Sequence, residues 1–137
     1  MHYILSLMDV ATLAARLIRS FEGLRLAAYQ DSGLVWTIGY GHTSGVTEGM
    51  SCAPEQAAEW LSADASNLFA LVADKPMIAA AAYVSFGFNC GRHALELVLA
   101  GQATLTNFVH DRHGQTRAGL VARRELEAAL IEASTAS

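Results

Sequence analysis

The sequence predicts an α+β fold that is mainly helical, with a small N-terminal β-hairpin lobe, a larger helical lobe and a cleft between them. The composition is rich in alanine and leucine and 53% hydrophobic, which favours helices packed around a core. Residues 24–42 are instead rich in strand-forming and turn-forming residues. The 137 residues contain no internal repeat and no low-complexity linker, so we expect a single domain over residues 1–137.

The first predicted helix follows Asp9, because apolar residues recur at steps of three and four from Val10 to Phe21. Asp9 suits the N-cap position, and Gly23 suits the end of the helix. This register puts Glu22 in the last turn, where the carbonyl end of the helix dipole favours a protonated carboxyl group. A purely structural helix more often carries lysine or arginine at that position.

A small β-hairpin or a three-stranded sheet is predicted over residues 24–42. Strand formers fill residues 35–40, and a turn-forming run that starts at Asp31 precedes them. Asp31 therefore falls at the turn, and Thr37 lies on the returning strand. A polar loop over residues 43–49 ends this unit.

Helices are predicted for the rest of the chain. Pro54 suits the first position of its helix, because the N–H that proline lacks would be unpaired there. The central helix has no polar face, so we expect it to be buried. Gly101 is expected to end the helix after it. The predicted segments are residues 54–65, 77–88, 94–100, 105–109 and about 120–133.

Two global features restrict the partners. The formal net charge is −4 with nine basic residues, so we expect no basic surface for nucleic acid. The apolar run at residues 3–8 is too short to span a bilayer, and it lacks the basic start and the cleavage site of a signal peptide. A retained signal-anchor helix is a less favoured alternative.

The cysteines and two of the histidines fit no recognised metal spacing. We expect Cys52 and Cys90 to be buried free thiols, and a single bridge between them after export stays open. His110 and His113 can share one helical face, but no third ligand lies near them in the sequence. We therefore expect surface histidines and no metal site.

Glu22 and Asp31 form a pair of carboxyl groups that a helix end and a returning hairpin can face across a gap. Hydrolysis of a glycosidic bond needs a proton donor for the leaving oxygen and a carboxylate that attacks or orients water. Thr37 would add a hydroxyl group able to hold that water. Taken alone, two acidic residues among 13 are more often solvated surface charges. The residues around them therefore decide whether the pair is interpreted as catalytic.

Those surrounding residues resemble the signature of the phage lysozyme family, glycoside hydrolase family 24. The matching runs are FEGLRL at residues 21–26, YQD at residues 29–31 and WTIGYGHT at residues 36–43. A looser similarity continues through residues 85–91 and 119–124, so the resemblance covers most of the chain.

The resemblance implies a lysozyme-like fold and a muramidase that cleaves the β-1,4 bond between N-acetylmuramic acid and N-acetylglucosamine in peptidoglycan, with no cofactor and no metal. Glu22 matches the catalytic acid of the family, Asp31 its second carboxylate and Thr37 its water-positioning threonine. The family mechanism is inversion, for which we expect roughly 6.5 to 9.5 Å between the carboxyl groups, whereas about 5 Å would indicate retention.

The same comparison implies supporting roles. His42 is expected to bond Asp64 as a buried structural ion pair, because a lone histidine among glycines and aromatics is more often structural than catalytic. Asn89 matches a position near the substrate. One arginine of the pair Arg123 and Arg124 is expected to reach the acid, although its charge favours the ionised form, so burial must outweigh the pairing.

Parts of the helical lobe depart from the family pattern. The chain is shorter than expected between Asp64 and Tyr83, and it lacks a tryptophan near residues 108–111. These departures leave the length of the interlobe helix and the distal sugar subsites open. Four aromatic residues follow helix spacing and are expected in the core rather than as sugar platforms: Trp60, Phe86, Phe88 and Phe108.

Other functions remain as alternatives. A lytic transglycosylase would use Glu22 alone to close an anhydro ring, so the presence of Asp31 and Thr37 disfavours it. A catalytically inactive peptidoglycan-binding protein would have no reason to keep an acid at a helix end. A structural domain without sugar contacts is the least favoured.

By resemblance to phage endolysins, we expect a monomer that serves host-cell lysis. It would be made in the host cytoplasm and reach the wall in the periplasm through a separate holin-type membrane protein. Its negative charge gives no long-range attraction to the anionic wall, so short-range contacts in a cleft must hold the substrate. A phage, prophage or bacterial origin remains open.

Overall fold

The computed structural model describes residues 2–135, with side chains from residue 10 onward. Helices dominate, and a two-stranded antiparallel sheet forms a small separate lobe, which confirms the predicted fold class. The α-helices (α), 3-10 helices (η) and strands are α1 (His2–Phe21), β1 (Arg25–Gln30), β2 (Trp36–Gly39), α2 (Pro54–Ala65), η1 (Ser66–Val72), α3 (Met77–Cys90), α4 (Arg92–Leu99), η2 (Leu105–Asn107) and α5 (Ala118–Thr135).

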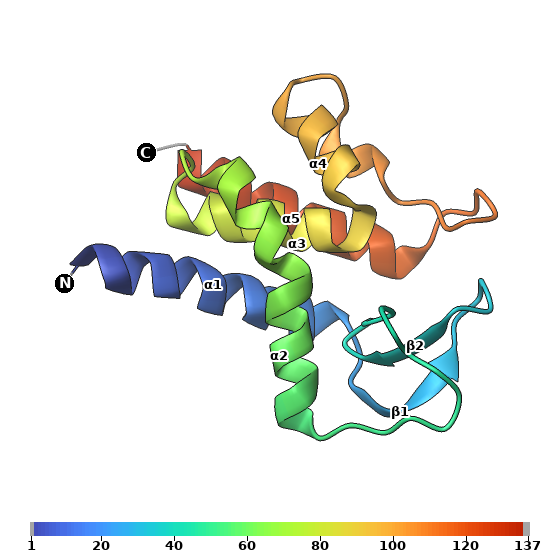
Figure 1. Ribbon diagram of the computed structural model, residues 1–137. Helices are drawn as coiled ribbons and strands as arrows, with labels where there is room; N and C mark the ends of the chain where they lie inside the picture. Colours follow the sequence, from blue (N-terminus) through green and yellow to red (C-terminus); the bar gives the residue numbers. More distant parts are fainter. Residues whose placement is uncertain (1, 136–137) are drawn as a thin grey trace.

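Helix α3 forms the centre of the larger lobe and packs against α1 and α5 (Figure 1). It is buried over residues 79–82 and 84–87, whereas Met77 and Ile78 in its first turn are exposed. The four consecutive alanines at residues 79–82 have small side chains, which let neighbouring helices approach closely. The prediction of a buried central helix is confirmed.

The start of α1 differs from the prediction, and its end agrees. Residues 2–9 contain no glycine or proline, so the helix continues through them and Asp9 is not its N-cap. At the other end the N–H of Glu22 donates to the carbonyl of Ile18 at 2.8 Å and closes the last turn. Gly23 follows without a positive φ. None of the helices in residues 2–135 has the length and apolarity that a membrane span needs.

The small lobe is the predicted hairpin. Strands β1 and β2 pair with Tyr29 opposite Thr37, and the register shifts once before this pair. Residues 50–52 bond to the other edge of β1: the N–H of Ala28 donates to Met50 and the N–H of Cys52 donates to Leu26, both at 2.9 Å. A short bridge therefore replaces a full third strand.

Helix α2 runs between the two lobes, as Figure 1 shows, and the short η1 continues it into the helical lobe. Pro54 begins α2 as predicted, whereas η1 was not predicted. Helices α4 and α5 start two residues before the predicted positions 94 and 120, a usual spread for helix ends. The expected segment at residues 105–109 is a single 3-10 turn. Gly101 ends the α4 region with a φ of 73°.

Candidate active site

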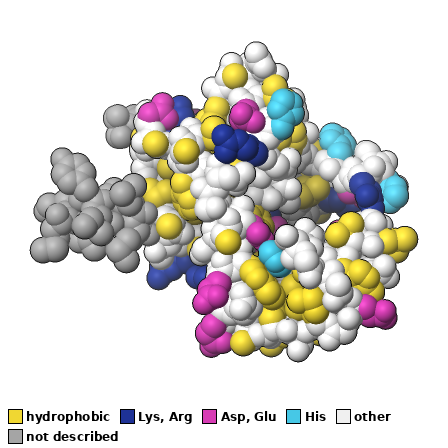
Figure 2. All heavy atoms as spheres, viewed as in Figure 1, with side chains coloured by type: hydrophobic (Ala, Val, Ile, Leu, Met, Phe, Trp, Pro, Cys, Tyr) yellow, Lys and Arg dark blue, Asp and Glu magenta, His cyan; other side chains and the backbone are white. Residues whose placement is uncertain are grey.

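A cleft of about 490 Å³ lies between the two lobes. In Figure 2, acidic side chains and a histidine lie beside the hollow between the lobes. Five of the residues singled out in the sequence line this cleft: Glu22, Asp31, Thr37, Asp64 and Asn89. A volume of this size is typical of sites that hold a ligand.

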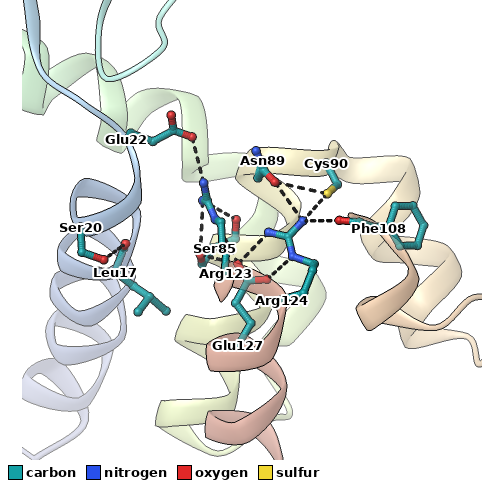
Figure 3. A network of polar contacts seen from close by, with 10 residues as sticks. All are labelled: Leu17, Ser20, Glu22, Ser85, Asn89, Cys90, Phe108, Arg123, Arg124 and Glu127. Carbon is teal, nitrogen blue, oxygen red and sulfur yellow. Dashed lines mark hydrogen bonds and ion pairs between the residues drawn. The ribbon is translucent and has the colours of Figure 1, made fainter. Parts of the chain in front are cut away.

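Glu22 directly follows α1, and its side chain lines the cleft. Its Oε1 accepts a hydrogen bond from Nη1 of Arg123 at 3.0 Å, which confirms the expected arginine contact (Figure 3). The Glu22 side chain is 27% exposed, whereas that of Arg123 is 4% exposed. Within residues 10–135, no donor bonds the other carboxyl oxygen of Glu22. The carboxyl group is thus anchored at one oxygen and open at the other.

Asp31 closes the turn of the hairpin. Its Oδ1 accepts hydrogen bonds from the N–H of Gly33 at 2.8 Å and of Val35 at 2.9 Å, which is the local bonding that aspartate makes in turns. The turn holds Leu34 at a φ of 62°, unusual for a residue with a side chain. No side chain or backbone N–H of the described part bonds Oδ2 of Asp31, so this oxygen is available in the cleft.

Thr37 is buried on β2, with 4% of its surface exposed. Its hydroxyl group donates to the carbonyl of Val35 at 2.9 Å. A hydroxyl group has one proton and two lone pairs, so the oxygen of Thr37 keeps the capacity to accept a hydrogen bond. Because Thr37 lines the cleft, it can accept that bond from a water molecule.

His42 and Asp64 form the expected pair, with 2.8 Å between Nδ1 and Oδ2. The ring of His42 also stacks on Trp60, 4.6 Å between centroids, so the pair ties the small lobe to α2. The expectation that the pair is buried is wrong. Asp64 is 33% exposed because it is near the end of α2, where the helix borders the cleft.

A buried ion cluster lies behind Glu22 and was not predicted from the sequence. Glu127, which is fully buried, accepts hydrogen bonds from Arg123, Arg124 and Ser85 (Figure 3). Arg124 continues to Oδ1 of Asn89 at 2.9 Å. The one available signal was the helical spacing of Arg123, Arg124 and Glu127, which places them on adjoining faces of α5.

Other lining residues also escaped the sequence reasoning. Phe88, expected in the core, is half-buried and lines the cleft, whereas Phe86 is fully buried. Arg92 and Asn67 line the cleft and bond to each other, side chain to carbonyl. Asn67 belongs to η1, which the apolar pattern did not indicate. Arg92 begins α4 two residues before the expected start.

The cysteines and the histidine pair are not among the residues that line the cleft. Cys52 and Cys90 are free, as expected, but they are half-buried rather than buried. Burial raises the pKa of the Cys90 thiol above its ordinary value of 9.0, and the charge of Arg124 opposes that shift. His110 and His113 lie in the loop before α5 rather than on one helical face. Within the described residues, no group of three His, Cys, Asp or Glu side chains could hold a metal ion.

Comparisons with known proteins show the family of the chain. Residues 19–127 match the family described as phage lysozyme. The chain is 32% identical to an endolysin of Lactococcus phage c2, over 95% of this chain and 63% of the endolysin. The chain spans between 44% and 63% of the length of the curated relatives that it matches.

Two solved structures share the lysozyme-like fold. The muramidase domain of SpmX from Asticaccaulis excentricus is 34% identical, with a TM-score of 0.71 over 86% of this chain and 93% of that domain. An endolysin from Escherichia coli O157:H7 phage FAHEc1 is 30% identical, with a TM-score of 0.72 over 87% of this chain and 90% of the endolysin.

Proposed function

The chain belongs to the phage lysozyme family, and we propose that it is a peptidoglycan hydrolase. We propose further that it is a muramidase, cleaving the β-1,4 bond between N-acetylmuramic acid and N-acetylglucosamine. The observation that carries this proposal is that Glu22, Asp31 and Thr37 line one cleft, with Glu22 beside the helical lobe and the other two in the hairpin. The proposed reaction uses no cofactor and no metal.

Glu22 is the general acid in this proposal. Its open oxygen gives a proton to the glycosidic oxygen as the bond between that oxygen and C1 of the muramic acid breaks. The carboxylate that results already faces Nη1 of Arg123 at 3.0 Å. Arg123 is buried and fixed by its other bonds, so it stabilises this new charge without having to reorganise.

Asp31 and Thr37 hold the attacking water. Oδ2 of Asp31 and the hydroxyl oxygen of Thr37 both accept hydrogen bonds, so one water can donate its two protons to them. A lone pair of that water then points away from both and towards C1. As the new bond between water and C1 forms, the water gives one proton to Asp31. This single displacement inverts the configuration at C1, and it requires roughly 6.5 to 9.5 Å between the carboxyl groups.

Asn89, His42 and Asp64 support the reaction. Arg124 occupies the amide oxygen of Asn89, which leaves the NH₂ group of Asn89 to donate to an acceptor in the cleft, such as the carbonyl of an N-acetyl group. The His42–Asp64 pair keeps the hairpin lobe fixed against α2 while the substrate lies between the lobes.

A biological role in host-cell lysis follows from the proposed activity. We propose that the protein acts as a monomer, is made in the host cytoplasm and reaches peptidoglycan in the periplasm through a separate holin-type membrane protein. Expression in a Gram-negative host with and without such a pore tests this route. Lysis without the pore would contradict it.

The test of the activity is turbidity loss of purified peptidoglycan with the wild type and with Glu22→Gln, followed by mass analysis of the glycan ends. Clearing by the wild type alone, with hydrated reducing ends, supports the proposal. Anhydro ends would identify a lytic transglycosylase. Binding without clearing would identify an inactive peptidoglycan-binding protein, and absence of binding a structural domain. The first anomer formed, followed by NMR, decides between inversion and retention.

A further inference from the structure

The carboxyl group of Glu127 lies at the centre of the ion cluster behind the cleft and is fully buried. Its Oε2 accepts from Oγ of Ser85 at 2.6 Å, Nη2 of Arg124 at 3.1 Å and Nε of Arg123 at 3.3 Å, and its Oε1 accepts from Nε of Arg124 at 2.6 Å. Three of the four donors belong to guanidinium groups, so Glu127 forms ion pairs with both arginines. Glu127 is therefore a fixed negative charge inside the helical lobe.

The two arginines extend from this charge to different parts of the cleft wall, as Figure 3 shows. Arg123 bonds Glu127 with Nε and the carbonyl of Ser85 with Nη2, so its rigid guanidinium plane leaves Nη1 directed at Glu22. Arg124 bonds Glu127 with Nε and Nη2, and its Nη1 is directed at Asn89. Glu127 thus holds both side chains by bonds on one edge of each guanidinium.

Aromatic rings hold the faces of the same guanidinium groups. Arg123 lies over the ring of Phe21, 4.9 Å from its centroid, and Arg124 lies over the ring of Phe86 at 5.0 Å. With edges and faces both occupied, neither arginine can turn without breaking the cluster.

The charges of the cluster depend on Glu127 as well. Two arginines and Glu127 sum to one positive charge, and an ionised Glu22 brings the sum to zero. Without Glu127, Glu22 would face two buried cations. Three other charged side chains line the cleft: Asp31 in the hairpin, Asp64 on α2 and Arg92 on α4. Arg117, just before α5, lines a second pocket together with Glu22 and Arg123. Helix α3 contributes the thiol of Cys90, which accepts a hydrogen bond from Arg124.

We propose that Glu127 is a positioning residue for the hydrolysis proposed above, on which this inference rests. Through Arg123 it fixes the carboxyl group of Glu22, and through Arg124 it fixes the amide of Asn89. The buried carboxylate of Glu127 therefore affects the charge around Glu22. It also affects the orientation of Asn89, which is proposed to contact the sugar.

The test compares Glu127→Gln with Glu125→Gln, an exposed acid on the same helix that serves as the matched control. Glu127→Gln leaves two cations near the carboxyl group of Glu22 and removes the second anion that balanced them. We expect its kcat at neutral pH to fall about tenfold or more, and the alkaline limb of its pH profile to move down by about one unit. Glu125→Gln should keep the wild-type profile. The proposal would be overturned if Glu127→Gln folds and the alkaline limb of its pH profile stays at the wild-type position.

Arg124→Gln provides a second, opposite test that does not require Glu127→Gln to fold. It removes one cation, so the alkaline limb should move to higher pH, and KM should rise because Asn89 loses its anchor. The double variant Arg124→Gln with Glu127→Gln restores the charge sum and should return the limb to its wild-type position, with KM still raised. An unmoved limb in Arg124→Gln contradicts the inference. Inactivity of the wild type on peptidoglycan would instead contradict the proposed function.

Discussion

Asp31 and Asp111 accept the same pair of backbone hydrogen bonds, although they lie in different parts of the chain. In each turn, Oδ1 bonds the N–H groups two and four residues later, at 2.8 and 2.9 Å for Asp31 and at 2.9 and 3.0 Å for Asp111. The residue three positions later has a positive φ in both, at Leu34 and at Gly114. The two turns differ at the second carboxylate oxygen. Oδ2 of Asp111 accepts a hydrogen bond from Arg117, whereas Oδ2 of Asp31 is open to the cleft.

This likeness separates the structural role of Asp31 from its proposed catalytic role. Asp31→Asn keeps an acceptor for both turn N–H groups and removes the charge at Oδ2, so we expect a folded protein with activity lowered by about 100-fold or more. Asp31→Ala should lose the turn bonds as well and unfold more easily by about 1 kcal/mol. Thermal unfolding and peptidoglycan clearing measure the two effects.

Asp111→Asn is the matched control, because it changes the same kind of turn at a residue that does not line the cleft. It should leave hydrolysis within about twofold of the wild type, since Oδ2 of Asp111 bonds Arg117 and does not face the cleft. Full activity in Asp31→Asn would show that the charge of Asp31 has no catalytic use.

Leu34 and Gly114 permit a paired test of backbone strain. Leu34 is 73% exposed and lies outside the cleft lining, and a side chain added at Gly114 would meet open space. We expect Leu34→Gly to be neutral or to stabilise the protein by less than about 1 kcal/mol, and Gly114→Leu to destabilise it by about 1 kcal/mol. Urea unfolding measures both. A clear loss of stability in Leu34→Gly would mean that packing of the side chain outweighs the strain.

Thr37 should tolerate serine but not valine. Thr37→Val keeps the shape and removes the hydroxyl group, so the attacking water loses one of its two acceptors and we expect a loss of activity of about tenfold or more. Its stability should fall by only about 1 kcal/mol, from the lost bond to Val35. Thr37→Ser should retain most of the activity. Equal rates for the valine and serine variants would remove Thr37 from the mechanism.

Asp111 should titrate below its ordinary pKa of 3.8. The hydrogen bond from the N–H of Gln115 is the largest cause of the lowered pKa, and Arg117 and His113 add to it. Because the pKa is lowered in the folded state, the stabilising contribution of this carboxylate is fully present above pH 3.8 and is lost as pH falls through the folded value. NMR titration of the Gln115 amide measures the midpoint, and Asp111→Asn should abolish that titration. A midpoint above 3.8 contradicts the prediction.

The local patterns of the sequence were sufficient for much of the fold. The apolar run without a polar face predicted α3, because a helix with no polar side has to be buried. The turn residues placed Asp31 at the hairpin tip, and the spacing after it placed Thr37 on the second strand. The start of α1 was wrong because a good N-cap residue does not by itself stop a helix from extending further.

The resemblance to a known family singled out Glu22, Asp31 and Thr37, and the packing of the two lobes brought them to one cleft. An arginine beside the acid was expected from the sequence, but the rest of the acid's surroundings depended on the tertiary structure. Arg123 and Glu22, Arg124 and Asn89, and Ser85 and Glu127 lie far apart in the chain and meet because α3 packs against both α1 and α5. Periodicity tells which face of a helix turns inward, but the partner that a buried charge finds there depends on how the helices are packed.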